Sequence, residues 1–262
     1  PEMDLPEVLE MANFEKMESI RKRVEESVDN PEIAEALKPW YALFCKRPCF
    51  DDEYLPTFNR ENVDLIDTGG LGVEKITPKG VVVAGQEYEV DCIIFATGFE
   101  VGTGYERRAG CEVIGADGRT LTEKWDKNGV STLHGLQTSG YPNYFMLGAN
   151  QGAFTVNFPH LLEEAATNAV YIIKHIFDEG HSTVDVKQEA EGEWVKTIIE
   201  KARGPIGAGP GSTECTPGYY NNEGHLNEKA RQGAPYGGGS VEFFKLMEDW
   251  RDKGDFAGLE FK

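Results

Sequence analysis

The chain has 262 residues, of which 40% are hydrophobic and 27% charged, and a formal net charge of −19 at pH 7. Its length accommodates one large or two modest domains, and its composition is ordinary for a globular protein. The negative charge argues against binding a nucleic-acid backbone, which requires basic surface. No apolar run reaches the roughly 18–20 residues that span a bilayer, and the acidic first residues do not resemble a signal peptide. We therefore expect a cytoplasmic protein that binds no membrane.

The cysteines and histidines give no sign of a metal site. The cysteines are odd in number and scattered, which favours free thiols in a reducing cytoplasm. They are Cys45, Cys49, Cys92, Cys111 and Cys215. No histidine has a partner at ligand spacing, so we expect no bound metal.

Two helices are predicted at the start of the chain. Residues 7–28 carry apolar side chains mostly at helical spacing. Asn30 and Pro31 are typical of a helix start, as N-cap and first-turn residue, and this second helix runs to about Leu37. Both helices are expected to be scaffold.

Strands are predicted in the next part of the chain. Residues 62–67 form a short strand, and residues 80–84 and 86–90 form a hairpin with Gly85 at its tight turn. Residues 92–96 are apolar enough to form a buried strand, which ends in small residues and a glycine. Such an ending lets another backbone or a ligand approach closely.

The second half of the chain is expected to be mainly helical. Residues 100–140 read as irregular connections, and a stretch dense in Gly and Pro begins at residue 204. The predicted elements are a buried strand at 144–148, helices at 159–177, about 189–202 and 240–250, and a final strand at 258–261.

Three short motifs carry most of the functional information. Residues 45–48 are Cys-Lys-Arg-Pro, residues 59–63 are Asn-Arg-Glu-Asn-Val, and residues 91–99 join the apolar strand to an Ala-Thr-Gly turn. Together they resemble Baeyer–Villiger monooxygenases, flavoproteins in which the third motif is the hinge between nicotinamide and flavin domains. No Gly-x-Gly-x-x-Gly turn, which normally opens each dinucleotide-binding domain, occurs in the chain. The resemblance therefore implies the C-terminal half of such an enzyme, with the N-terminal half as its partner.

The fold class that the resemblance implies is α/β, with two partial dinucleotide-binding (Rossmann-like) domains of a two-domain flavoprotein. Residues 1–44 would be a helical excursion of the nicotinamide domain, and residues 45–96 the C-terminal part of this NADP-binding domain. Residues 97–262 would be the C-terminal part of the FAD-binding domain, with a mobile loop at about 204–224. Without the N-terminal half, this chain is expected to bind FAD weakly or not at all.

The implied reaction uses NADPH, FAD and O2 to insert one oxygen atom next to the carbonyl of a ketone, through a C4a-peroxyflavin, giving an ester or lactone. The resemblance assigns Arg47 to the reactive face of the flavin and Lys46 to the 2′-phosphate region of NADPH. The residue types suit these roles, because a guanidinium stabilises an anion without supplying a proton and an ammonium suits a phosphate. From the pair alone, a solvated basic turn is the alternative.

Further site residues follow from the resemblance. A strand, a polar loop and a helix start aim backbone N–H groups and a positive dipole end at one point, and in the family this loop meets the flavin. A surface loop before an amphipathic helix is the alternative. The predicted cofactor-binding residues, besides Lys46, are Ala96, Thr97, Gly98, Gln151, Thr155, Asn157 and Phe158.

Phe154, Tyr219 and Tyr220 are predicted to shield the substrate. Many family members carry a tryptophan where this chain has Thr216, and an aromatic ring with a polar tip could take over its contact. The Tyr-Tyr-Asn-Asn-Glu-Gly sequence that begins at Tyr219 resembles the branch that acts on large-ring or steroid-like ketones. A structural glycine-rich linker is the alternative for this stretch.

Two other functions remain open from the sequence. One is a flavin monooxygenase that oxidises nitrogen or sulfur in soft nucleophiles. The other is a cofactor-free, non-catalytic fragment. Product analysis discriminates the first from a ketone monooxygenase, and flavin absorbance with NADPH consumption excludes the second.

Overall fold

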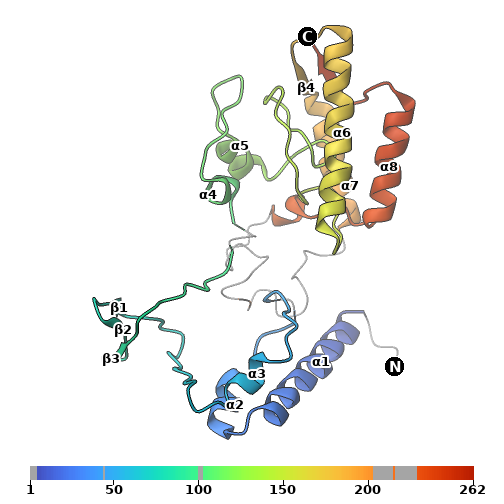
Figure 1. Ribbon diagram of the computed structural model, residues 1–262. Helices are drawn as coiled ribbons and strands as arrows, with labels where there is room; N and C mark the ends of the chain where they lie inside the picture. The colour runs from blue at the N-terminus through green and yellow to red at the C-terminus, as the bar shows by residue number, and fades with distance from the viewer. Residues whose placement is uncertain (1–4, 44, 100–102, 203–214, 216–228) are drawn as a thin grey trace. The chain divides into compact units, whose positions relative to one another are not determined.

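The chain divides into two compact units (Figure 1). The computed structural model describes residues 5–43, 45–99, 103–202, 215 and 229–262. One unit comprises Pro1–Val101 and Pro210–Tyr219, and the other comprises Gly102–Gly209 and Tyr220–Lys262. The assignment of residues 45–96 and 97–262 to two cofactor domains stays a prediction.

Three helices belong to the first unit: α1 (Leu5–Ser27), α2 (Pro31–Leu37) and α3 (Tyr54–Thr57). The start of α2 is the predicted one, because the Asn30 side chain accepts hydrogen bonds from the backbone N–H groups of Glu32 and Ile33. Both predicted helices are thereby confirmed. The helices pack around one apolar cluster made of Val24, Val28, Ile33, Ala34, Leu37, Leu55 and Phe58.

A small antiparallel sheet completes the regular structure of this unit. Its strands, in the order β1 (Lys75–Ile76), β2 (Gly80–Val83) and β3 (Gln86–Glu89), pair Val83 with Gln86 at the β2–β3 turn. Ala84 and Gly85 at this turn have φ angles of +49° and +77°. Two consecutive left-handed residues are the conformation that matches the twist of a tight hairpin. The predicted hairpin is confirmed.

Two predicted strands of the first unit are absent. Residues 62–67 and residues 92–96 have no strand conformation, and residues 92–96 are exposed rather than buried. Ile94 is 86% exposed and Phe95 is 70% exposed. A strand becomes buried only when neighbouring strands pair with it, and within the described ranges none pairs with this segment. Pattern alone could not supply that missing neighbour.

The cysteines also differ from the prediction. Cys45 and Cys215 form a disulfide across a sequence separation of 170 residues, while Cys49, Cys92 and Cys111 are free and exposed. Nothing in the spacing of the cysteines signals a pair so far apart. In the chain-entropy model, closing a loop of this length stabilises the folded state by about 5 kcal/mol.

The second unit is built on three long helices, α6 (Phe158–Glu179), α7 (Gln188–Lys201) and α8 (Ser240–Lys253), which confirm three predicted helices. Figure 1 shows α8 beside α6. The buried members of their shared core include Leu161, Ile172, Trp194, Ile198, Phe243, Met247 and Trp250. β4 (Val184–Val186) pairs antiparallel with β5 (Leu259–Phe261), so the predicted final strand is confirmed and finds a partner that the sequence did not reveal.

The region expected to be irregular contains two short helices, α4 (Tyr105–Ala109) and α5 (Leu121–Asn128). α5 begins with a capping box, because Thr120 and Glu123 each accept a hydrogen bond from the other's backbone N–H group. That Thr-x-x-Glu signal is present in the sequence and was missed. Residues 144–148, predicted as a buried strand, have no strand conformation and are only partly buried; the Met146 N–H group donates to a loop carbonyl, that of Leu136, at 2.7 Å.

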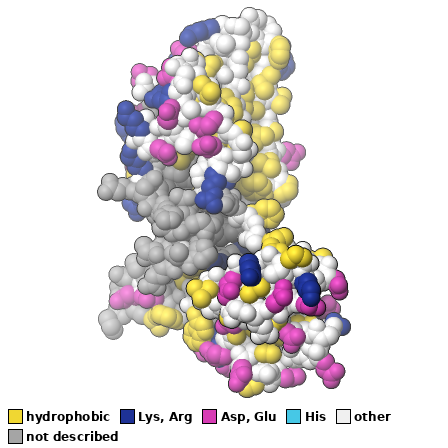
Figure 2. All heavy atoms as spheres, turned by 90° about the vertical axis from the view of Figure 1, so that its left-hand side faces the viewer, with side chains coloured by type: hydrophobic (Ala, Val, Ile, Leu, Met, Phe, Trp, Pro, Cys, Tyr) yellow, Lys and Arg dark blue, Asp and Glu magenta, His cyan; other side chains and the backbone are white. Residues whose placement is uncertain are grey.

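The surface carries both signs of charge. On the face drawn in Figure 2, acidic and basic side chains are interspersed with apolar ones. Within the described residues, no helix is both long and apolar enough to cross a membrane.

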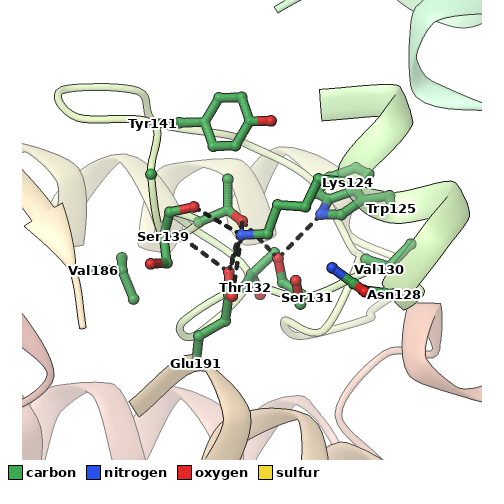
Figure 3. Close-up of polar contacts among 12 residues, drawn as sticks. Lys124, Trp125, Asn128, Val130, Ser131, Thr132, Ser139, Tyr141, Val186 and Glu191 are labelled. Carbon is green, nitrogen blue, oxygen red and sulfur yellow. Dashed lines mark hydrogen bonds and ion pairs between the residues drawn. The ribbon is translucent and has the colours of Figure 1, made fainter. Parts of the chain in front are cut away.

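A buried ion pair fastens α5 to α7 (Figure 3). The Lys124 ammonium lies 2.9 and 3.1 Å from the two carboxylate oxygens of Glu191, and each side chain is at most 7% exposed. The ammonium also donates to Thr138 Oγ1 at 2.7 Å and to the Ser139 carbonyl at 2.8 Å. Burial lowers the pKa of Lys124, and the Glu191 carboxylate opposes that shift.

Glu191→Gln should lower the free energy of unfolding by about 3 kcal/mol, because it leaves the buried Lys124 ammonium without its counter-charge. Chemical denaturation followed by tryptophan fluorescence measures this change. Glu248→Gln, which breaks the exposed pair with Lys245, is the matched control and should change stability little. Equal effects of the two substitutions would contradict the role assigned to the buried pair.

Candidate functional site

The loop that precedes α6 is held from inside by Gln151, which is completely buried. Its amide oxygen accepts hydrogen bonds from the Thr132 N–H and hydroxyl groups at 2.8 and 2.7 Å. Its amide nitrogen donates to the carbonyls of Val130 and Gln232 at 2.9 and 2.7 Å. Every polar atom of the side chain is thus engaged by the protein. Any effect of Gln151 on a flavin is therefore indirect, through the position of this loop.

Backbone contacts reinforce the anchoring of the loop. The Gln151 N–H group donates to the Ala234 carbonyl at 3.1 Å, and the indole N–H group of Trp194 donates to the Gln151 carbonyl at 3.1 Å. Gln151 itself has a φ angle of +55°, a left-handed conformation that a non-glycine residue rarely adopts. Such a conformation persists only where surrounding contacts enforce it.

The residues after this anchor face outward. Phe154 is 41% exposed, Val156 fully exposed and Phe158 45% exposed, while Thr155 is partly buried. Asn157 is the N-cap of α6, because its side-chain oxygen accepts a hydrogen bond from the His160 N–H group at 3.3 Å. Exposed apolar side chains therefore stand beside the positive end of a 22-residue helix. That surface suits a ligand with an aromatic body and a negatively charged edge.

His134 packs behind the loop. Its ring lies edge-on to Trp194, with the ring centroids 4.8 Å apart, and edge-on to Trp250 at 5.7 Å. Burial lowers the pKa of His134 to about 4, so the imidazole is neutral at pH 7. A neutral, enclosed ring of this kind is a packing residue, as the sequence predicted for the histidines.

Gly135 brings the next turn of chain directly against the loop. A Cβ atom at this position would lie 2.7 Å from the Asn150 carbonyl oxygen and 2.9 Å from the Gly152 nitrogen. The φ angle of Gly135 is +73°, which also favours glycine. Only a residue without a side chain fits between these two backbones.

The Lys46–Arg47 pair lies in the first unit, directly after Cys45. Lys46 is partly buried and Arg47 is exposed. Among the described residues, no ion pair holds the Arg47 guanidinium, so its charge is available to a ligand. The thiol of Cys49 contacts the Arg47 carbonyl at 3.7 Å.

Ala96, Thr97 and Gly98 also belong to the first unit, and all three are exposed. Gly98 has a φ angle of +84°, so the turn requires glycine at this point. Thr155, Asn157 and Phe158 are close in sequence within the second unit, as predicted. Tyr219 and Tyr220, the predicted shielding residues, lie outside the described residues.

Gly135→Ala should lower the free energy of unfolding by about 2 kcal/mol or more, because the new methyl group overlaps the backbone of residues 150–152. Gly140→Ala is the matched control: its φ angle is +87°, but no atom lies within 4 Å of the added carbon. We expect the control to cost about 1 kcal/mol, the strain of the left-handed backbone alone. Denaturant titration compares the two variants, and equal losses would contradict the crowding at Gly135.

The chain is similar to curated monooxygenases, although no family model matches it. It is 45% identical over 261 residues to neopentalenolactone D synthase of Streptomyces avermitilis, covering 99% of this chain and 43% of that protein. It is 46% identical over 257 residues to the FAD-binding monooxygenase hmp7 of Hypomyces subiculosus (98% and 42%). It is 41% identical over 254 residues to the Baeyer–Villiger monooxygenase ATR8 of Stachybotrys chlorohalonatus (97% and 40%).

Solved structures give the same result. The polycyclic ketone monooxygenase of Thermothelomyces thermophila superposes with a TM-score of 0.81 at 34% identity, covering 95% of this chain and 40% of that one. A steroid monooxygenase bound to NADP superposes with a TM-score of 0.73 at 28% identity (96% and 46%). The chain thus spans about two-fifths of the length of the curated relatives it matches. It is homologous to the C-terminal portion of Baeyer–Villiger monooxygenases.

Proposed function

We propose that the chain is the C-terminal portion of a flavin-dependent Baeyer–Villiger monooxygenase. The net reaction converts a ketone, O2, NADPH and a proton into an ester or lactone, NADP⁺ and water. The observation that carries the proposal is the 41–46% identity, over almost the whole chain, to proteins named as monooxygenases of this kind. The proposed fold is that of two partial dinucleotide-binding domains, completed by the rest of the enzyme.

The donor chemistry of the described residues fits FAD and NADPH. When bound, FAD supplies the activated oxygen and NADPH supplies the electrons. Thr155, Asn157 and Phe158 stand at the start of α6, whose positive dipole end favours the negatively charged end of a reduced flavin. Lys46 would hold the 2′-phosphate of NADPH as a point charge. Ala96, Thr97 and Gly98 would allow close approach of a backbone or cofactor edge.

Arg47 is the proposed catalytic residue. An exposed guanidinium with no ion pair among the described residues offers a fixed positive charge to an anionic oxidant and to the oxyanion that forms on the ketone. Because its pKa is far above neutrality, it stabilises these anions without giving up a proton. Protonation of the oxidant would release hydrogen peroxide in place of ester.

The remaining portion of the enzyme is the proposed partner of the segment at residues 92–96. Ile94 and Phe95 are largely exposed, and so is Phe99 at 85%. Apolar residues in an extended run are suited to a central strand of a parallel sheet, buried on both faces. We propose that strands supplied by the N-terminal portion pair with this segment.

The proposed substrate class is large-ring or polycyclic ketones. Two similar structures are described as polycyclic ketone and steroid monooxygenases, which agrees with the resemblance of the Tyr-Tyr-Asn-Asn-Glu-Gly sequence. The exposed rings of Phe154 and Phe158 provide apolar surface for such a substrate and for the flavin.

Product analysis tests the function. The holoenzyme that contains this chain, given NADPH, a polycyclic ketone and isotopically labelled O2, should yield an ester or lactone that carries one labelled oxygen atom. Mass spectrometry measures the product. N- or S-oxides as the sole products would support a different flavin monooxygenase, and a colourless protein that consumes no NADPH would support a non-catalytic role.

Arg47→Ala in the holoenzyme should keep NADPH oxidation and reduce ester formation by about 100-fold or more, because one charge that stabilises the developing anion is lost. Hydrogen peroxide should appear in place of the ester. The control is Lys79→Ala, which removes an exposed basic side chain paired with Glu89 in the same unit. Normal ester yield in Arg47→Ala would refute the assigned role.

A further inference from the structure

The disulfide between Cys45 and Cys215 lies beside the two proposed cofactor residues. Both cysteines are buried, at 3% and 4% exposure, and their Cα atoms are 5.1 Å apart. Cys45 is one residue from Lys46 and two residues from Arg47. A covalent bond is therefore placed directly at the base of the segment that carries both charges.

Little else fixes that segment. Residues 46–50 contain no helix or strand, and Phe50 is 94% exposed. Within the described part of the chain, the backbone N–H groups of Arg47, Cys49 and Phe50 donate no hydrogen bond, and Pro48 has none to donate. A segment of this kind has few interactions to restrict its conformation.

Two fixed points bracket Arg47. Downstream, the Asp51 carboxylate accepts hydrogen bonds from the N–H groups of Glu53 and Tyr54 at 2.8 and 2.6 Å, at the start of α3. Upstream, the Cys45 N–H group donates to the Ala42 carbonyl at 3.0 Å, and the disulfide adds the covalent tie. Without that bond, the upstream point would keep one backbone hydrogen bond.

We propose that Cys45 and Cys215 are positioning residues for Arg47 and that the redox state of their disulfide controls the coupling of NADPH oxidation to ester formation. This inference rests on the function proposed above. Charge stabilisation in catalysis is sensitive to the position of the charge, and a displacement of about 1 Å costs on the order of 100-fold in rate. The oxidised pair holds Arg47 in place, and the reduced pair releases it.

The switch is a thiol–disulfide exchange with a dithiol reductant. The reductant's thiolates attack the Cys45–Cys215 bond through a mixed disulfide, and two electrons and two protons pass to the pair. The S–S bond breaks, two thiols form, and the reductant becomes a disulfide. Disulfides that occur in a reducing compartment are usually transient, catalytic or redox-sensing, which agrees with a regulatory role.

The experiment compares the oxidised holoenzyme with Cys45→Ser, Cys215→Ser and the double variant. Cys49→Ser is the matched control, because Cys49 is a free, exposed thiol in the same segment. Peptide mapping without reductant should find Cys45 linked to Cys215. Flavin content and NADPH oxidation should be unchanged in all variants. The ratio of ester formed to NADPH consumed should fall by about tenfold in the three variants of the pair and stay normal in Cys49→Ser.

Dithiothreitol provides a test that does not depend on a variant folding. It should lower the coupling of the wild-type enzyme to the level of the double variant, reoxidation should restore it, and the double variant should not respond. A purely structural role would not produce this reversible change in product ratio.

The outcomes separate the inference from the function on which it rests. Ester formation that is equal in the wild type and the double variant, or native peptides with Cys45 and Cys215 unlinked, would overturn the inference and leave the proposed function intact. A fully oxidised wild-type enzyme that forms no ester would overturn the proposed function, and the inference with it.

Discussion

The burial of a single amide side chain organises the second unit. Gln151 joins three stretches of chain that are distant in sequence, around residues 130–132, 151 and 232–234, through hydrogen bonds to backbone groups. A buried amide whose donors and acceptors are all satisfied contributes to stability, whereas the same group with one partner missing would be destabilising. The loop before α6 can present Phe154, Val156 and Phe158 to solvent because its base is fixed in this way.

The sequence predicts the helices well because their determinants are local. Asn30 caps α2 through its own neighbours, and the apolar stripe of α6 lies on one helix face whatever packs against it. The hairpin at Gly85 is equally local, since two left-handed residues suffice to reverse the chain. The capping box at Thr120 belongs to the same class, and its signal was present but not used.

The sequence could not predict features that depend on distant partners. Residues 92–96 have the composition of a buried strand, but burial depends on neighbouring strands, which no local pattern can provide. The bond between Cys45 and Cys215 and the pairing of β4 with β5 each join segments far apart in the chain. For the candidate site, the resemblance identified the segments, while the buried role of Gln151 emerged only from the structure, because exposure of a side chain depends on the whole fold.

The unpaired segment at residues 92–96 has a consequence for the solution behaviour of this chain. Ile93, Ile94 and Phe95 form a consecutive apolar run, free of proline and charge, whose backbone has no sheet neighbour among the described residues. Such a run is a template for any other extended chain, including the same run in a second molecule. Produced without a covering partner, the chain would self-associate edge to edge through these residues, so its tendency to aggregate would report how completely that edge is covered.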